Sequence, residues 1–324
     1  MLSMVVPVYN EQESLAALLT ELDEVARENR YEIEVIFVDD GSSDGSWDEI
    51  ERLASADGRV RGIRFRRNFG KAAALDAGFG SARGEIVFTL DADLQDDPRE
   101  IPRFLEKLRE TDDGGELDVV SGWKQVRHDP WHKVGPSRVF NWLVGFLTGV
   151  RLHDHNCGFK CYRRKIFEEV HLYGELHRFV PVLAAARGWR VGEIVVNHRA
   201  RKFGHSKYGV ARIVKGFLDL LTVCFLTGYG RRPLHLLGTL GLIGFTLGGL
   251  GVAALSLWWV TSRLDGNVEN DLHLHERAIF YYSMGIMLLG GQFFSVGVLA
   301  ELMTAFYSRE SASYSIRQTT CEAS

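Results

Sequence analysis

The sequence has few cysteines and no long block of like charges, and each shortage excludes a class of protein. Four cysteines in 324 residues do not make a disulfide framework, and nothing about them implies an oxidising compartment. The net charge is −4, with no basic run long enough to indicate nucleic-acid binding. His153, His155, Cys157 and Cys161 cluster, but their spacing matches no paired zinc motif. We interpret the two cysteines of this cluster as small buried hydrophobes.

Two further signals are missing near the amino terminus. No basic start with an apolar stretch and a cleavage site is present, so we predict no signal peptide and a cytoplasmic N-terminal domain. No G-x-G-x-x-G motif follows the first apolar run, which argues against a dinucleotide-dependent dehydrogenase.

The residues after that first run still suit a nucleotide. Tyr9 offers an aromatic face to a base, and the carboxylates of Glu11 and Asp40 could accept hydrogen bonds from its N–H groups. The alternative is structural, because Tyr9 and Glu11 would also serve as a hydrophobic staple and a first-turn charge of a helix.

The chain up to about residue 230 alternates strand-like and helix-like patterns. We expect strands over 3–8, 34–38, 60–65, 85–90, 117–121 and 191–196. We expect helices over 11–27, 70–82 and 101–108, and one beginning after Asp44. This alternation predicts an α/β fold with a mostly parallel sheet and helices on both faces.

Acidic residues follow the apolar run that ends near Leu90. Asp91, Asp93 and Gln95 come directly after this expected strand, and ligands of open α/β sheets bind at such strand ends. Two carboxylates and an amide oxygen are hard ligands that suit Mg²⁺ or Mn²⁺, with substrate phosphates completing the coordination. An acidic surface turn that caps the next helix is the alternative reading.

Six motifs occur in order along the chain. They are Pro7-Val8-Tyr9-Asn10-Glu11, Val38-Asp39-Asp40-Gly41-Ser42, Asn68-Phe69-Gly70-Lys71, Asp91-Ala92-Asp93-Leu94-Gln95, Asn156-Cys157-Gly158-Phe159-Lys160, and Arg201-Lys202-Phe203-Gly204-His205-Ser206-Lys207-Tyr208. The set resembles family 2 glycosyltransferases with the GT-A fold, a Rossmann-like α/β fold. It looks most like the dolichyl- or polyprenyl-phosphate sugar synthases, and the resemblance covers residues 1 to about 230 closely.

The resemblance implies a role for individual residues. Pro7, Tyr9, Glu11 and Asp40 would line the nucleoside pocket, and Lys71 would lie near the base or ribose. Asp91 would contact ribose or metal, while Asp93 and Gln95 would hold the metal on the donor diphosphate.

Three basic residues would act on phosphate according to the same resemblance. Arg201 and Lys207 match a loop that closes over the diphosphate, and the flexible basic stretch around Gly204 suits that task. Lys124 stands where many relatives carry Arg, and the two side chains bind phosphate with different geometry. Asp154 is the nearest candidate for a catalytic base, unless it only caps a turn.

Two long apolar segments occupy the last third of the sequence. Leu234 to Val260 and Ala278 to Ala300 contain no Lys, Arg, Asp or Glu, and each is long enough to cross a bilayer. Arg231 and Arg232 precede the first, and Arg309 and Arg317 follow the second, which favours cytoplasmic ends and an outer loop over 261–277. The G-x-x-x-G pair Gly244 and Gly248 is compatible with helix association, so the sequence leaves open whether the chain forms a homo-oligomer.

Two shorter segments could face the membrane. Residues 210–226 read as an interfacial helix or as a helix that caps the catalytic domain, and 140–147 form a second apolar patch. We therefore expect a catalytic domain over 1–208, an interfacial helix over 209–230, two transmembrane helices within 231–308 and a cytoplasmic tail over 309–324.

The best reading of the sequence is an inverting, metal-dependent membrane glycosyltransferase. It would move one sugar from a nucleotide-diphosphate sugar to a polyprenyl phosphate, and the absence of a Q-x-x-R-W motif argues against a polymerising enzyme. Two alternatives remain open: transfer to a hydroxyl acceptor, which needs a working base such as Asp154, and a non-catalytic scaffold that binds nucleotide sugars. The sugar, the base of the nucleotide and the lipid length are not specified by the sequence.

Overall fold

The structure is a computed structural model, and its chain forms two compact units. It describes residues 1–112, 115–125, 131–172, 174–197, 199, 211–229, 233–264 and 274–307. The first unit holds residues 1–227 and contains the sheet, and the second begins at residue 228 and contains two long apolar helices.

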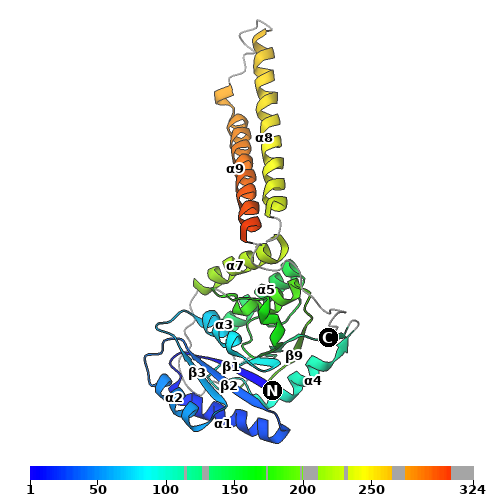
Figure 1. Cartoon of the computed structure of the whole chain (residues 1–324). Helices are drawn as coiled ribbons and strands as arrows, with labels where there is room; N and C mark the ends of the chain where they lie inside the picture. Colours follow the sequence, from blue (N-terminus) through cyan, green and yellow to red (C-terminus); the bar gives the residue numbers. More distant parts are fainter. Residues whose placement is uncertain are drawn as a thin grey trace, which may run out of the picture. The chain divides into compact units, whose positions relative to one another are not determined.

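A seven-stranded sheet organises the first unit (Figure 1). Its strands are β1 (Leu2–Val8), β2 (Ile33–Asp39), β3 (Val60–Arg64), β4 (Ile86–Thr89), β7 (Val119–Trp123), β8 (Lys160–Arg163) and β9 (Val191–Val195). They lie in the order β3-β2-β1-β4-β8-β7-β9, and among them only β8 runs antiparallel to its neighbours. The predicted mostly parallel α/β sheet is therefore confirmed, while β8 is a strand that the sequence did not predict.

The order of the strands reverses at β1 and β4. From β1 the chain continues to β2 and β3 on one side, and then returns to β4 on the other side of β1. In open α/β sheets ligands bind outside the carboxyl ends of the strands at such a reversal. The turns that follow β1, β2 and β4 meet at this edge.

Helices cover both faces of the sheet. Those of the first unit are α1 (Gln12–Asn29), α2 (Ser46–Ala56), α3 (Lys71–Ser81), α4 (Ile101–Arg109), α5 (Trp131–Thr148), α6 (Val180–Ala186) and α7 (Ala211–Cys224). Side chains of β1 alternate between two cores: Met4 and Val6 pack with Leu18 of α1, whereas Val5 packs with Leu75 of α3. Figure 1 shows α1 and α2 on the side of the sheet opposite to α3.

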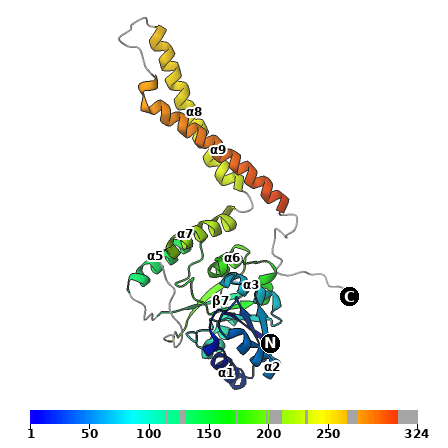
Figure 2. The same ribbon diagram turned by 90° about the vertical axis from the view of Figure 1, so that its left-hand side faces the viewer.

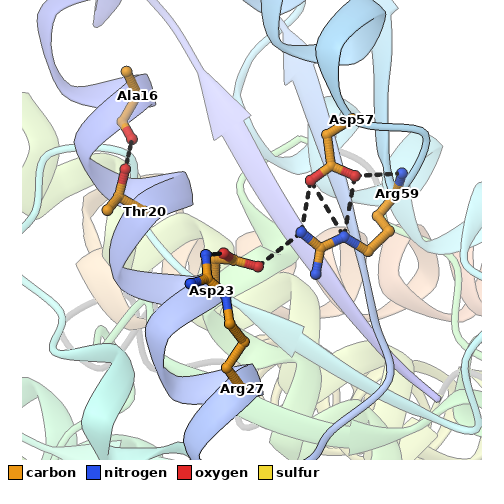
Figure 3. A network of polar contacts seen from close by, with 6 residues as sticks. All are labelled: Ala16, Thr20, Asp23, Arg27, Asp57 and Arg59. Carbon is orange, nitrogen blue, oxygen red and sulfur yellow. Dashed lines mark hydrogen bonds and ion pairs between the residues drawn. The ribbon is translucent and has the colours of Figure 1, made fainter.

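The outer surface of α1 carries ion pairs that are open to water (Figure 3). Arg59 Nη2 lies 2.7 Å from Asp23 Oδ1 and 2.7 Å from Asp57 Oδ2, and its side chain is 46% exposed. Thr20 Oγ1 donates to the carbonyl of Ala16 at 2.9 Å in the same view. Exposed ion pairs of this kind contribute only about 0–1 kcal/mol, so the stability of the unit comes mainly from its buried cores.

Helices α5 and α7 lie side by side and pack against each other (Figure 2). Val144 of α5 and Leu220 of α7 belong to one buried cluster. On the outer side, Trp142 and Phe146 of α5 stack at 5.6 Å between ring centroids, and both are more than two-thirds exposed. Exposed apolar residues of α7 are Phe217, Leu218 and Leu221. The amphipathic helix predicted near 210–226 is thus present.

The second unit is a hairpin of α8 (Pro233–Leu264) and α9 (Ala278–Tyr307). Both helices are long and apolar enough to cross a membrane, and few of their residues are buried. Glycines allow a close approach: a Cβ on Gly248 would lie 2.4 Å from Met287 N, and one on Gly290 would lie 2.2 Å from Phe245 N. The G-x-x-x-G pair of α8 therefore faces α9 of the same chain.

Candidate active site

The first two turns at the carboxyl edge of the sheet are tied to each other. Asn10, with a positive φ of 58°, follows β1 and accepts a hydrogen bond from Ser43 N at 2.8 Å through its side chain. Its own N–H donates to Ser42 Oγ at 2.9 Å. Asn tolerates the left-handed conformation better than most residues, which explains its place in this turn.

Asp40 holds the loop that leads into α3. One carboxylate oxygen accepts from Phe69 N at 2.7 Å, and the other accepts from Gly70 N at 3.0 Å. Burial and the neighbouring Asp39 raise the pKa of Asp40, although the two N–H groups oppose the rise. Gly70 has a φ of 96°, a conformation that favours glycine. This loop sets Lys71, the first residue of α3, at the site.

Asp91 forms an ion pair with Lys71 at the end of β4. Its side chain is one-third exposed. Partial burial would raise the pKa of Asp91, but the ammonium groups of Lys71 and Lys124 outweigh it and hold the pKa at about 2. The carboxylate is therefore ionised at any physiological pH and already attracts cations.

The carboxylate of Asp96 lies next to this ion pair. Asp96 is buried and accepts from Asp91 N at 3.3 Å, while Lys124 Nζ lies 3.1 Å from Asp96 Oδ1. Burial would lower the pKa of Lys124, but Asp96 and Asp91 raise it above its usual value. Lys124 is thus paired with a carboxylate that sequence reasoning did not assign to the site, although Asp96 stands in the same acidic stretch.

The turn after Asp91 contains the predicted metal ligands. Asp93 is buried, and its Oδ1 accepts from Gln95 N at 3.2 Å. Leu94 between them has a φ of 60°, a strained value for a branched side chain and a feature that concentrates at functional sites. Gln95 Nε2 donates to the carbonyl of Arg199 at 3.4 Å, and Arg199 N donates back to the carbonyl of Gln95 at 2.9 Å.

These residues fit a hard divalent cation that shares its coordination with a substrate. Among the described residues no three His, Cys, Asp or Glu side chains form a group that could enclose a metal ion. Mg²⁺ and Mn²⁺ do not need such a cage, because one or two carboxylates and substrate phosphates suffice. The Lys71 ammonium on Asp91 also shows that this carboxylate takes a positive group at the strand end.

The segment before β8 runs against the Asp91 turn. A Cβ on Gly158 would lie 2.7 Å from Asp91 Oδ2, so only glycine fits there without displacing the carboxylate. Thr89 Oγ1 donates to the carbonyl of Gly158 at 2.7 Å. Asp154 is 1% exposed, and its Oδ1 accepts from Asn156 N at 3.1 Å. The structure therefore brings the candidate base into the same part of the fold as Asp91.

Buried titratable groups surround this segment. Lys160 Nζ donates to the carbonyl of His155 at 3.1 Å, and burial lowers the pKa of Lys160 to about 8. Burial also lowers the pKa of His155 to about 3, so its ring is neutral. Burial raises the pKa of Cys157 to about 12, and Cys161 is buried as well. Such thiols are inert, which agrees with reading them as packing residues.

The remaining predicted residues lie at or beyond the edge of the sheet. Pro7 is in β1 opposite Val38, Tyr9 is 41% exposed directly after β1, and Glu11 precedes α1 with its N–H donating to Ser46 Oγ at 3.0 Å. Arg201 and Lys207 lie outside the described residues. The structure thus brings Asp91, Asp93, Gln95, Lys71, Lys124 and Asp154 to one region, with Tyr9, Glu11 and Asp40 at the neighbouring strand ends.

Comparisons with solved structures agree with this fold. Glucosyl-3-phosphoglycerate synthase from Mycobacterium tuberculosis, in complex with Mn²⁺, uridine diphosphate and phosphoglyceric acid, matches with a TM-score of 0.53 at 17% identity, over 69% of this chain and 78% of that chain. Mannosyl-3-phosphoglycerate synthase from Rubrobacter xylanophilus matches with a TM-score of 0.56 at 14% identity, over 69% and 74% of the two chains.

Sequence comparisons find relatives that match a larger share of the chain. The Rhizobium johnstonii protein named dodecaprenyl-phosphate galacturonate synthase is 37% identical over 98% of this chain and 92% of its own length. The Pseudomonas fluorescens undecaprenyl-phosphate 4-deoxy-4-formamido-L-arabinose transferase is 37% identical over 94% of this chain and 85% of its own. The model of the family "Glycosyl transferase family 2" matches residues 3–171. With this match, and with relatives that span almost its whole length, the chain belongs to glycosyl transferase family 2 and is a glycosyltransferase.

Proposed function

We propose that the chain transfers a single sugar from a nucleotide-diphosphate sugar to a polyprenyl phosphate at the membrane, with inversion at the anomeric carbon. One observation carries the proposal: an ionised carboxylate, Asp91, lies at the reversal point of the sheet in a chain whose full-length relatives are named polyprenyl-phosphate sugar transferases. The two apolar helices would keep this site at the surface where such a lipid is found.

The donor would bind at the ends of β1, β2 and β4. Tyr9, Glu11 and Asp40 would face the nucleoside together with Pro7, and Lys71 would lie near the base or ribose. Asp91, Asp93 and Gln95 would hold Mg²⁺ or Mn²⁺, which supplies charge neutralisation for the leaving diphosphate. In the absence of donor, Lys71 and Lys124 keep the charge of the Asp91 and Asp96 carboxylates compensated.

The acceptor would approach from the side of the 153–158 segment. A phosphate oxygen of the lipid attacks the anomeric carbon, and the bond from that carbon to the diphosphate oxygen breaks on the opposite face. A phosphate monoester is already ionised near neutral pH, so the main tasks of the protein are orientation and charge stabilisation. Asp154 would orient the acceptor or accept a proton from it. Arg201 and Lys207 would close over the phosphates.

Membrane attachment would involve more than the helical hairpin. We propose that α8 and α9 span the bilayer, that residues 1–208 and the 309–324 tail lie in the cytoplasm, and that the 261–277 loop lies outside. The exposed apolar side chains of α5 and α7 would rest in the membrane interface, where aromatic rings such as Trp142 are favoured. Residues 209–230 would form the connection between the catalytic domain and the hairpin.

The test is a donor and acceptor screen with the full-length protein in detergent. Labelled nucleotide sugars are supplied with Mn²⁺ or Mg²⁺ and with either undecaprenyl phosphate or undecaprenol. We expect transfer to the phosphate that disappears when the metal is chelated. Transfer to undecaprenol instead would favour a hydroxyl acceptor and a base role for Asp154. Nucleotide-sugar binding without any metal-dependent transfer or hydrolysis would favour a scaffold and contradict the proposal.

A further inference from the structure

The segment 153–158 is held at both of its ends. At the later end, the carbonyl of Gly158 accepts from Thr89 Oγ1 at 2.7 Å, directly before the Asp91 turn. At the earlier end, the backbone of His153 and Asp154 reaches Glu193 on β9, which is nearly buried, with 12% of its side chain exposed. The fixed segment therefore bridges the carboxyl end of β4 and the outermost strand of the sheet.

The Glu193 carboxylate uses both oxygens on this segment. Oε1 accepts from His153 N at 2.9 Å and from Asp154 N at 3.1 Å. Oε2 accepts from His153 N at 3.1 Å and contacts His153 Nδ1 at 2.7 Å. The strand pairing places Glu193 beside Ser121 of β7, so its backbone position is fixed by the sheet.

Two more contacts restrict His153. The ring of His153 stacks on Trp123 at the end of β7, with 4.0 Å between the ring centroids and 14° between the planes. Asn141 Nδ2 of α5 donates to the carbonyl of His153 at 2.5 Å. Glu193 also reaches the next residue, because its Oε1 accepts from the backbone N–H of Asp154 at 3.1 Å.

We infer that Glu193 is a positioning residue for sugar transfer: it fixes the backbone at 153–154 and so holds the Asp154 carboxylate in place. The inference rests on the proposed function, because it assigns Asp154 to the acceptor side of that site. Side chains that orient reacting groups must hold them within a fraction of an ångström, and a carboxylate that binds two successive backbone N–H groups does this.

Glu193→Gln separates positioning from packing. Glutamine has the same size, but it is uncharged, and an amide nitrogen in place of Oε2 would put a donor against His153 N, which lies 3.1 Å from that oxygen. The two backbone N–H groups would therefore be held less strongly. With labelled donor, Mn²⁺ and undecaprenyl phosphate, we expect kcat for transfer to fall roughly ten- to a hundredfold. The donor KM and the slow hydrolysis of donor without acceptor should stay within about twofold of wild type, because Asp91 and Asp93 are untouched.

The decisive comparison is made in an Asp154→Asn background. If Glu193 acts through Asp154, adding Glu193→Gln there should lower transfer by no more than about twofold further, since groups that act as a unit are not additive. Hydrogen exchange gives a second readout, with faster exchange expected at the amides of His153 and Asp154 and unchanged exchange in the rest of β9.

The matched control is Asp118→Asn, at the other end of the same strand pair. Asp118 accepts from Arg190 N at 2.9 Å, so the variant also removes a carboxylate bond to backbone next to β9, but not to the 153–158 segment. It should leave transfer unchanged. Full transfer by Glu193→Gln, or multiplicative losses in the double variant, would overturn the inference while wild-type transfer upholds the proposed function. A wild type that transfers to no polyprenyl phosphate would overturn the proposed function itself.

Discussion

The half of the sheet formed by β3, β2, β1 and β4 and the half formed by β8, β7 and β9 build their parts of the site differently. In the first half, the side chains of Asn10, Asp40 and Asp93 bind backbone N–H groups of nearby turns and so shape the loops at the strand ends. In the second half, Lys160 and Glu193 project from strands and hold one segment. The first arrangement fixes the loops at the strand ends, and the second fixes a segment that runs against the Asp91 turn.

Asp93→Ala tests the first half and should have the largest effect. Asp93 would help to hold the metal that neutralises the charge of the leaving diphosphate, so its loss should lower transfer on the order of a thousandfold, with little change in melting temperature. Initial rates in saturating Mn²⁺ measure this. Asp48→Ala, which removes an exposed carboxylate of α2, is the control and should behave as wild type. Near-normal turnover of Asp93→Ala would remove the metal role from this turn.

Lys160→Met tests the second half of the sheet. It asks whether a lysine that holds the 153–158 segment lowers the free energy of unfolding. Burial lowers the pKa of Lys160 to about 8, so its ammonium is destabilising at pH 7, where the unfolded chain is charged without penalty. Between about pH 8 and 10.5 the unfolded state binds more protons than the folded one, so wild-type stability should rise through that window.

We therefore expect Lys160→Met to be more stable than wild type at pH 7, by on the order of 2 kcal/mol, and less active. The advantage should shrink above about pH 10, because Lys160 is then neutral in both states. Melting temperatures across pH 7–10.5 in detergent measure both effects. A variant that is less stable at pH 7 would show that the bond from the ammonium to the His155 carbonyl outweighs the cost of burying the charge.

Gly290→Ala extends the comparison to the hairpin, where glycines let α8 and α9 approach closely. A Cβ at Gly290 would lie 2.2 Å from Phe245 N, and the helices would have to separate. Overpacking of this kind costs about 1–3 kcal/mol, which should appear as a lower melting temperature in detergent. Gly285→Ala is the matched control on the same helix, because nothing lies within 4 Å of its added Cβ. Equal behaviour of the two variants would contradict the close packing of α8 on α9.

Arg59→Ala should have the smallest effect. It removes the ion pairs with Asp23 and Asp57 on the outer surface, which lie at the amino end of β3, away from the carboxyl ends of the strands, and are screened by water. Stability should change by less than about 1 kcal/mol, and transfer should not change. Melting at low and high salt checks this, and a large loss at high salt would show that the network is more than a surface feature.

The first half of the site could be predicted from the sequence because its signals are local. A buried strand followed by Asp91, Asp93 and Gln95 identifies a strand-end turn without any knowledge of the rest of the chain. The same local patterns predicted β1 to β4 and the helices between them to within a few residues.

The second half could not be predicted because its contacts join distant residues. Four residues of β8 carry no alternation that distinguishes a strand, and only pairing with β4 and β7 makes them one. The pairing of Lys124 with Asp96 and of Glu193 with His153 depends on that sheet order. The strand expected over 117–121 lies at Val119–Trp123 for the same reason: its partners set its limits. The roles of the site residues stay predictions until activity is measured.

One measurement tests the division of the site most directly: donor hydrolysis and transfer to undecaprenyl phosphate, measured side by side for Asp93→Ala and Asp154→Asn. Asp93→Ala should lose both reactions, because it weakens the hold on the donor. Asp154→Asn should lose transfer roughly ten- to a hundredfold and keep donor KM and hydrolysis within about twofold of wild type. If Asp154→Asn loses hydrolysis together with transfer, or if Asp93→Ala keeps either reaction, the account is contradicted. The first half of the sheet would then not hold the donor separately from an acceptor side built by the second half.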